Sequence, residues 1–412
     1  MHQANDTLGN AYTVNHDASV TQIAHIIDAY LGSQATVMPL LDELLRTDPG
    51  MPMAICLRTY LLKLGSDPRL ATPIQRGLDS LKALEGSLNP REKMHLQALT
   101  SWVANQLLAT VETLEAILAS YPRDMLALRL AHYLHFYAGS AKNMRASVTR
   151  SLNNWAPADP YYGYLLGMYS FGLEESGDYT QAERYGKQAI DFNPADIWAA
   201  HAVTHVFQMQ ERFAEGIQWI ESLVPHWDEA NGFVYHLHWH KALCHLGMRD
   251  NDGALSIYDT HLAKAVDDDF YLDTCNAASL LWRLEILGVD VGQRWQALQA
   301  ISAARVSDSE LIFSTLHYLM APARLNDQAT VDRALKSLLA WSQANTTQGD
   351  ICREGGLPIA NALINIGKGD AHQAANDLSA VADQIYLIGG SHAQRDLFTQ
   401  IQQFSASHSH SH

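Results

Sequence analysis

The feature that most constrains the fold is a pattern that repeats near the middle of the chain. A run of helix-forming residues from Tyr164 reaches a turn at 177–179, and a second run ends at Pro194. The same pattern returns 34 residues later, where a turn at 211–213 aligns with the first, and a third copy begins near His236. A fixed period of this length indicates helical hairpins that pack on their neighbours along the chain.

An aromatic or leucine residue, then small residues, then a closing proline in a unit of about 34 residues is typical of tetratricopeptide repeats. Weaker copies of the pattern extend in both directions, and their ends coincide with prolines and helix breakers. Short alternating strand patterns are nearly absent. The sequence therefore predicts an all-α fold, a superhelical α-solenoid of tetratricopeptide-type helix hairpins with about twelve to fourteen helices.

No segment of linker composition divides this succession of units. We therefore expect a single solenoid domain over residues 18–404. Residues 1–17 are predicted to be a flexible N-terminus, and residues 405–412 a flexible, low-complexity Ser/His tail.

Charge and cysteine usage narrow the class of partners and the compartment. The net charge of −16 argues against nucleic acid as a partner and against anionic membrane surfaces. The first twenty residues lack the features of a signal peptide, and no apolar run is long enough to span a membrane. The four cysteines are far apart and form no CxxC pair, which favours reduced thiols and a cytoplasmic protein.

Several segments resemble the tetratricopeptide repeat protein 38 family. They are RDMLALRLAHYLHFYAG (123–139), GMYSFGLEESGDY (167–179), IWAAHAVTHVFQMQERFAEGI (197–217), FVYHLHWHKALCHL (233–246), ASLLWRLEILGVDVGQRW (278–295) and GGSHAQRDLF (389–398). The resemblance covers most of the chain. It implies an α-solenoid fold, and it implies little about activity.

The resemblance also implies that the first helix of each hairpin faces the concave surface. The inward residues of three consecutive first helices would be Tyr164, Gly167, Phe171 and Glu174, then Trp198, His201, His205 and Gln208, then His236, Trp239 and His240. His201 and His205 are four residues apart, as are His236 and His240, so each pair shares one helix face. We expect the two pairs and Glu174 to converge on one patch.

Imidazole is the commonest nitrogen ligand of transition metals, and two histidines at i, i+4 can hold one ion. We therefore predict His201, His205, His236 and His240 as ligands of a divalent metal, zinc or iron. Neither pair encloses the glutamate of HExxH, so Glu174 would have to supply a carboxylate. Two alternatives stay open: a metal-free site for a polar or anionic ligand, and histidines that only pack.

Other candidates lie outside the two pairs. His132 and His135 are three residues apart on another first helix, and packing is favoured for them. In GGSHAQRDLF, Ser391 is a good N-cap, and the helix start could hold an anion. There His392 would be an acid or base, Arg395 would grip a carboxylate or phosphate, and Asp396 would help to bind the ligand. The alternative is a capped terminal helix with a surface Arg–Asp pair. His317 is a further catalytic candidate.

Nucleotide- and flavin-binding motifs and the GxSxG nucleophile motif are absent. The favoured hypothesis is an enzyme of small-molecule metabolism, with hydrolysis or another metal-assisted polar reaction as the preferred chemistry. Tyr164, Trp198 and Trp239 would bind its substrate, and His392, Arg395, Glu174 and His317 would be catalytic. The alternative is a scaffold that binds a peptide or partner protein in the concave groove. The His- and aromatic-rich groove, poor in Lys and Arg, favours the enzyme.

Overall fold

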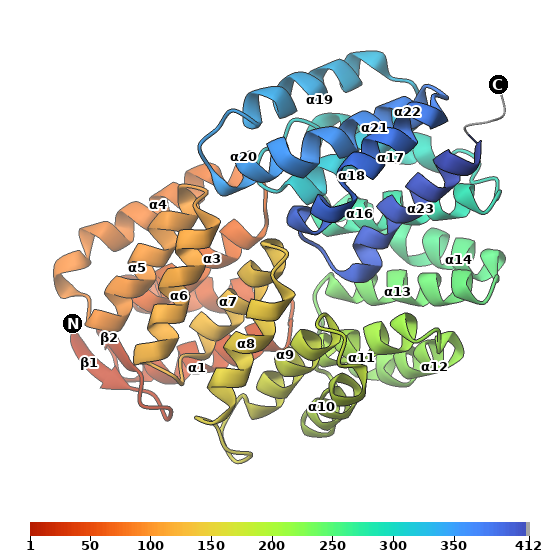
Figure 1. Cartoon of the computed structure of the whole chain (residues 1–412). Helices are drawn as coiled ribbons and strands as arrows, with labels where there is room; N and C mark the ends of the chain where they lie inside the picture. The colour runs from red at the N-terminus through yellow and green to blue at the C-terminus, as the bar shows by residue number, and fades with distance from the viewer. Residues whose placement is uncertain (409–412) are drawn as a thin grey trace. The chain divides into compact units, whose positions relative to one another are not determined.

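The computed structural model describes residues 1–408, and these are largely helical (Figure 1). The α-helices are α1 Ala18–Leu31, α2 Val37–Thr47, α3 Pro52–Leu64, α4 Ala71–Ala83, α5 Pro90–Val103, α6 Leu107–Ser120, α7 Met125–Tyr137, α8 Ala141–Leu152, α9 Tyr162–Glu174, α10 Tyr179–Phe192, α11 Ile197–Met209, α12 Phe213–Leu223, α13 Phe233–Gly247, α14 Asn251–Ile257, α15 Ala263–Ala265, α16 Tyr271–Ile286, α17 Arg294–Arg305, α18 Ile312–Arg324, α19 Gln328–Trp341, α20 Thr347–Ile351, α21 Leu357–Gly367, α22 Ala371–Ala380 and α23 His392–His408. The predicted all-α solenoid class is confirmed, with more helices than expected.

The α9–α10 hairpin shows how the repeat pattern becomes a packed pair of helices. Gly177 adopts φ +80° between the two helices. Small residues then let the helices approach closely, because a Cβ on Gly186 would lie 2.7 Å from the Ser170 hydroxyl oxygen. That hydroxyl donates a hydrogen bond to the carbonyl oxygen of Ala182, 2.7 Å away. The turn and small residues read from the sequence are therefore the elements that make this hairpin.

The same turn recurs in most of the hairpins. A residue with positive φ lies two positions before the second helix of seven hairpins, at Asn105, Gly139, Gly177, Glu211, Arg249, Asn326 and Gly369. The left-handed conformation ends the first helix and directs the chain back along it. Asparagine, glutamate and arginine occupy this position as well as glycine, so glycine spacing alone underestimates the number of repeats.

The described residues form two compact units. The first comprises residues 1–136, 140–206 and 218–234, and the second comprises residues 137–139, 207–217 and 235–412. Residues 409–412 of the second range, which belong to the predicted Ser/His tail, lie outside the described residues. Residues 405–408 continue helix α23. The predicted single domain over 18–404 stays a prediction.

The N-terminus differs from the expected flexible segment 1–17. Strands β1 (His2–Asn5) and β2 (Ala11–Val14) form an antiparallel hairpin. Thr13 is buried, and its backbone N–H and hydroxyl donate to the Glu92 carboxylate at 2.8 and 2.7 Å. Glu92 also closes a capping box with Asn89 at the start of α5. A carboxylate far away in sequence thus orders a segment whose own composition gave no strand signal.

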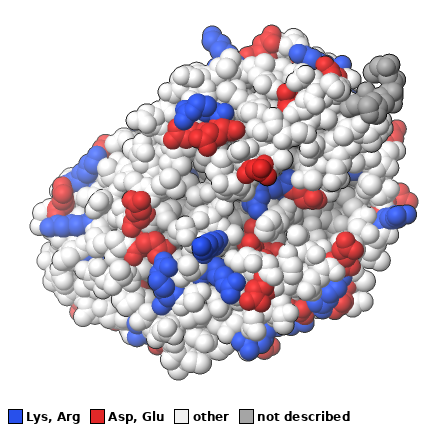
Figure 2. Space-filling model, in the orientation of Figure 1, with Lys and Arg blue, Asp and Glu red and all other residues white. Residues whose placement is uncertain are grey.

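The surface carries few charged side chains, as the composition leads one to expect. Acidic and basic side chains lie interspersed over the face in view, with wide uncharged areas between them (Figure 2). No helix in the described part of the chain is long and apolar enough to cross a membrane. The four cysteines are buried and free of disulfides.

Candidate metal centre and its surroundings

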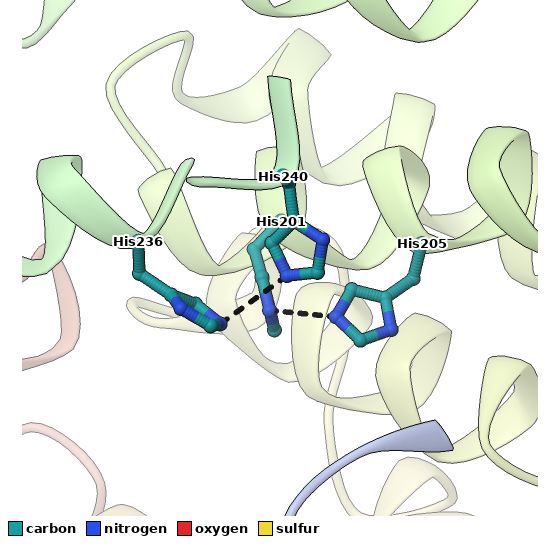
Figure 3. Close-up of side chains that lie close together, drawn as sticks. All are labelled: His201, His205, His236 and His240. Atoms are coloured by element: carbon teal, nitrogen blue, oxygen red, sulfur yellow. Dashed lines mark hydrogen bonds between the residues drawn. The ribbon is translucent and has the colours of Figure 1, made fainter. Parts of the chain in front are cut away.

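The first histidine pair lies on α11, in the first unit. His201 and His205 are four residues apart, and both are buried. Their Nε2 atoms are 2.8 Å apart and their ring centroids 4.3 Å apart (Figure 3). The i, i+4 spacing thus brings the two reactive nitrogens together on one face of the helix.

Aromatic rings enclose this pair. Phe171 lies 5.2 Å from the ring of His201 and 5.4 Å from that of His205, measured between centroids. Trp198 and Phe233 each lie 5.3 Å from His201. The walls around the two imidazoles are therefore apolar, which strengthens any electrostatic contact made at their nitrogens.

Two carboxylates face the opposite side of His205. Its Nδ1 lies 3.4 Å from Oε2 of Glu174 and 3.9 Å from Oε1 of Glu175, and both glutamates are buried. A carboxylate at Nδ1 holds the proton on that nitrogen and leaves the Nε2 lone pair toward His201. Glu174 therefore lies behind the ring, and this geometry suits a positioning role better than the predicted catalytic one.

The second pair lies on α13, in the second unit. His236 and His240 are buried, and their Nε2 atoms are 3.2 Å apart (Figure 3). Nδ1 of His236 donates to Oδ1 of Asn276 at 3.0 Å, and Nδ1 of His240 donates to Oε1 of Gln208 at 2.8 Å. Trp239 stacks on His236 with a centroid distance of 5.2 Å and donates its indole N–H to Ser279 Oγ.

The oxygen atoms beside the imidazoles decide which ring nitrogen carries the proton. A neutral imidazole carries one N–H and one lone pair. Side-chain oxygens at Nδ1 of His205, His236 and His240 place the lone pair of each ring on Nε2. Two lone pairs that face one another at about 3 Å repel unless a proton or a cation lies between them. In the second pair two lone pairs face one another, which suits a cation, whereas in the first pair Nε2 of His201 can donate a hydrogen bond to Nε2 of His205. The predicted metal role of the four histidines stays a prediction.

The predicted ligand-binding aromatics differ in exposure. Trp198 and Trp239 are buried beside the first and second pair. Tyr164 on α9 is half-buried, and its hydroxyl accepts a hydrogen bond from Nδ2 of Asn193 at 3.2 Å. Burial is the main cause that raises the pKa of Tyr164 above its usual range, so it acts as a neutral phenol. Ligand binding by these three residues stays a prediction.

The GGSHAQRDLF segment forms the start of α23. The amide of Gln394 donates to Ser391 Oγ, and its side chain accepts from the Ser391 amide, so the N-cap is internally satisfied. The Arg395 guanidinium donates to the carbonyl oxygen of Gly390, and Asp396 is exposed. His392, Arg395 and Asp396 line a cleft of about 1110 Å³ in the second unit. Their predicted roles stay predictions, and the capping leaves fewer free amides for an anion.

His317 is enclosed in the core of the second unit. Its Nδ1 donates to the carbonyl oxygen of Phe313 at 2.7 Å, and its ring lies 4.4 Å from Phe313 and 6.0 Å from Phe398. Burial lowers the pKa of His317 to about 4. This geometry supports packing, and the predicted catalytic role gains no support from it.

Several polar residues near the histidines carry no signal in the sequence. Asn276 on α16 and Arg129 on α7 carry no motif. Gln208 was placed on the inner surface without a role. Its spacing of three from His205 was the one available signal.

No family model matches the sequence. Solved structures with a similar arrangement include a tetratricopeptide repeat protein from Parabacteroides merdae, 11% identical over 77% of this chain and 98% of that one, with a TM-score of 0.39. A Rap protein complexed with competence and sporulation factor is 12% identical over 86% and 94%, with a TM-score of 0.40. The human IFIT1 dimer with m7Gppp-AAAA is 10% identical over 90% and 95%, with a TM-score of 0.38. Likeness at this level transfers no function.

Proposed function

We propose that this protein is an enzyme of small-molecule chemistry that holds a metal ion through His201, His205, His236 and His240. The approach of the Nε2 atoms, 2.8 Å in the first pair and 3.2 Å in the second, carries the proposal. Two nitrogen ligands, each about 2.0–2.1 Å from one ion, lie about 3.3 Å apart at the tetrahedral angle and about 2.9 Å apart at a right angle. The spacing of the second pair lies between these two values, and that of the first pair lies just below the smaller one.

That both pairs hold the same ion rests on the order of the hairpins. Helices α11 and α13 are the first helices of consecutive hairpins, and the repeat pattern predicts that their inward histidines converge. Four imidazoles suit zinc or iron better than calcium or magnesium, which prefer oxygen ligands.

The oxygen atoms at Nδ1 would support the ligands. Glu174 behind His205, Gln208 behind His240 and Asn276 behind His236 fix the orientation of each ring. Partners of this kind also make the ligating nitrogen a better electron donor. Glu174 would therefore act through His205.

When bound, the ion would polarise a carbonyl group or lower the pKa of a bound water, which suits hydrolysis. The protein would contribute a water-poor surrounding, with Phe171 and Trp198 beside the first pair and Trp239 beside the second. We also propose that the protein belongs to the tetratricopeptide repeat protein 38 family and that it is cytoplasmic.

Elemental analysis of the purified protein tests the metal site. The Ser/His tail 405–412 is removed first, because it would bind metal by itself, and no metal column is used. We expect about one equivalent of zinc or iron per chain, lost in His201→Ala and equally in His240→Ala, since each variant removes one ligand of four. Circular dichroism checks that both variants fold.

His245→Ala is the matched control, because His245 lies on the same helix as His240 and pairs instead with Asp250. This variant should keep its metal. Metal at background level in the parent protein, or metal retained in both ligand variants, would contradict the proposal. Stoichiometric capture of a protein partner by the metal-free chain would then favour the scaffold alternative.

A further inference from the structure

Arg129 is a buried cation without an ion pair. It lies on α7 and is 2% exposed. Its Nη2 donates to the hydroxyl of Tyr133 at 2.9 Å, and among residues 1–408 it has no carboxylate partner. The other buried arginines are better satisfied: Arg91 and Arg305 pair with carboxylates, and Arg283 donates to two backbone carbonyls. A buried charge without such a partner is costly.

Several other buried polar atoms around Arg129 also lack partners. They are Nε of Arg129 itself, both ring nitrogens of His132, Nε1 of Trp198 and Oδ2 of Asp196. All four residues are at most 4% exposed. Buried groups of this kind are nearly always paired, so the unpaired donors of Arg129, His132 and Trp198 point to a bound acceptor, whereas Oδ2 of Asp196 would need a donor.

Aromatic contacts show that these residues are neighbours. The Arg129 guanidinium lies 4.4 Å from the ring centroid of Trp198 and 4.5 Å from that of Tyr133. The ring of His132 lies 5.6 Å from that of Trp198. Trp198 therefore contacts both the Arg129 guanidinium and the His132 imidazole. Tyr133 is half-buried and is more exposed than the other three residues.

We propose that Arg129, His132, Tyr133 and Trp198 form a buried site for the carboxylate group of a small-molecule ligand. The planar guanidinium matches a carboxylate, and the imidazole and indole N–H groups supply further donors. Asp196, whose carboxyl group lies close enough to Arg129 for their charges to interact, opposes any anion, and it opposes a phosphate dianion more strongly than a carboxylate monoanion.

The position of Trp198 links this site to the metal centre. Its ring lies 5.6 Å from His132 on one side and 5.3 Å from His201 on the other. A carboxylate at Arg129 would leave the rest of the molecule beside His201. The substrate class that follows is a small carboxylic acid with a second polar group, and this step rests on the proposed function.

Binding to the metal-free full chain tests the carboxylate site independently of the metal. Propionate, benzoate, succinate and inorganic phosphate are titrated in turn by calorimetry, after removal of metal with a chelator. We expect saturable binding of at least one carboxylate at one site per chain, and none of phosphate. Arg129→Met should weaken that binding about ten- to hundredfold, because a charge-assisted contact is lost.

Arg184→Met is the matched control, since Arg184 also lies over a tyrosine ring, 4.5 Å from the centroid of Tyr185, but is exposed. It should bind the carboxylate as the parent does. The proposal is overturned if no carboxylate binds, if Arg129→Met binds equally well, or if phosphate is the ligand that Arg129 selects. The binding experiment uses metal-free protein, so its result does not depend on whether the elemental analysis finds metal. Failure of the carboxylate site and failure of the metal site can therefore be told apart.

Discussion

Two buried arginines of the first unit have the same exposure and opposite surroundings. Arg91 and Arg129 are each 2% exposed, and each lies over a tyrosine ring, at 4.6 Å for Arg91 and 4.5 Å for Arg129. Arg91 donates to Asp124 at 2.8 Å, and Asp124 also accepts from Nε2 of His95 at 2.9 Å. Arg129 has no such carboxylate, although Asp196 and His132 lie nearby.

The difference teaches that burial alone does not identify a functional residue. The Arg91 network joins β2, α5 and the start of α7, since Arg91 also donates to the carbonyl oxygen of Ala11. Its charges are paired, so it stabilises the fold as it stands. The groups around Arg129 are left unpaired, which costs stability unless a ligand supplies what is missing.

The largest expected effect contrasts the two arginines directly. Arg91→Met should lower the free energy of unfolding by about 3–5 kcal/mol, because it leaves Asp124 as an unpaired buried charge. Arg129→Met should leave it unchanged or raise it in the ligand-free protein. Urea denaturation of both variants measures the contrast, and a comparable loss in both would show that Arg129 is a structural residue like Arg91.

The second prediction concerns the carboxyl groups of Asp124 and Asp196, whose pKa values shift in opposite directions. His95 and Arg91 hold the pKa of Asp124 below its usual value despite burial, whereas burial raises the pKa of Asp196 to about 6. Asp196 therefore binds a proton more tightly in the folded chain than in the unfolded one. Its ionisation lowers the free energy of unfolding, and this loss develops as the pH rises from about 4 to 6.

Asp196→Asn removes this cost while an amide oxygen can still accept from the amide of Trp198. We expect the variant to be more stable than the parent by about 2 kcal/mol at pH 7 and by almost nothing at pH 4. Asp124→Asn should show the reverse sign, a loss that is full at pH 7 and shrinks below about pH 4. Equal behaviour of the two variants across this range would contradict the comparison.

The smallest expected effect is that of His132, in comparison with His95. His95→Phe should cost about 1–3 kcal/mol, because Asp124 loses a donor. His132→Phe should be neutral or stabilising by about 1 kcal/mol, since both nitrogens of His132 lack partners. Thermal unfolding at pH 7 compares them, and a clear destabilisation by His132→Phe would indicate that its nitrogens are satisfied in the folded protein.

Much of the fold followed from local pattern. The period of 34 residues located the hairpins around residues 164–258, and the i, i+4 spacing predicted that each histidine pair shares a face. Helices α1, α3 and α4 lie outside the three copies of the pattern that the sequence located around residues 164–258. The β1–β2 hairpin was missed because its stability depends on Glu92, 79 residues from Thr13.

The sequence by itself determined the helical repeat and the two histidine pairs, because both depend on spacings within a few turns of one chain segment. Only the tertiary structure decided which buried groups are paired. Asp124 reaches Arg91 across 33 residues, and Asn276 reaches His236 across 40. Arg91 and Arg129 look alike in sequence, and their surroundings differ because Asp124 forms a direct ion pair with Arg91, whereas Asp196 interacts with Arg129 only at longer range.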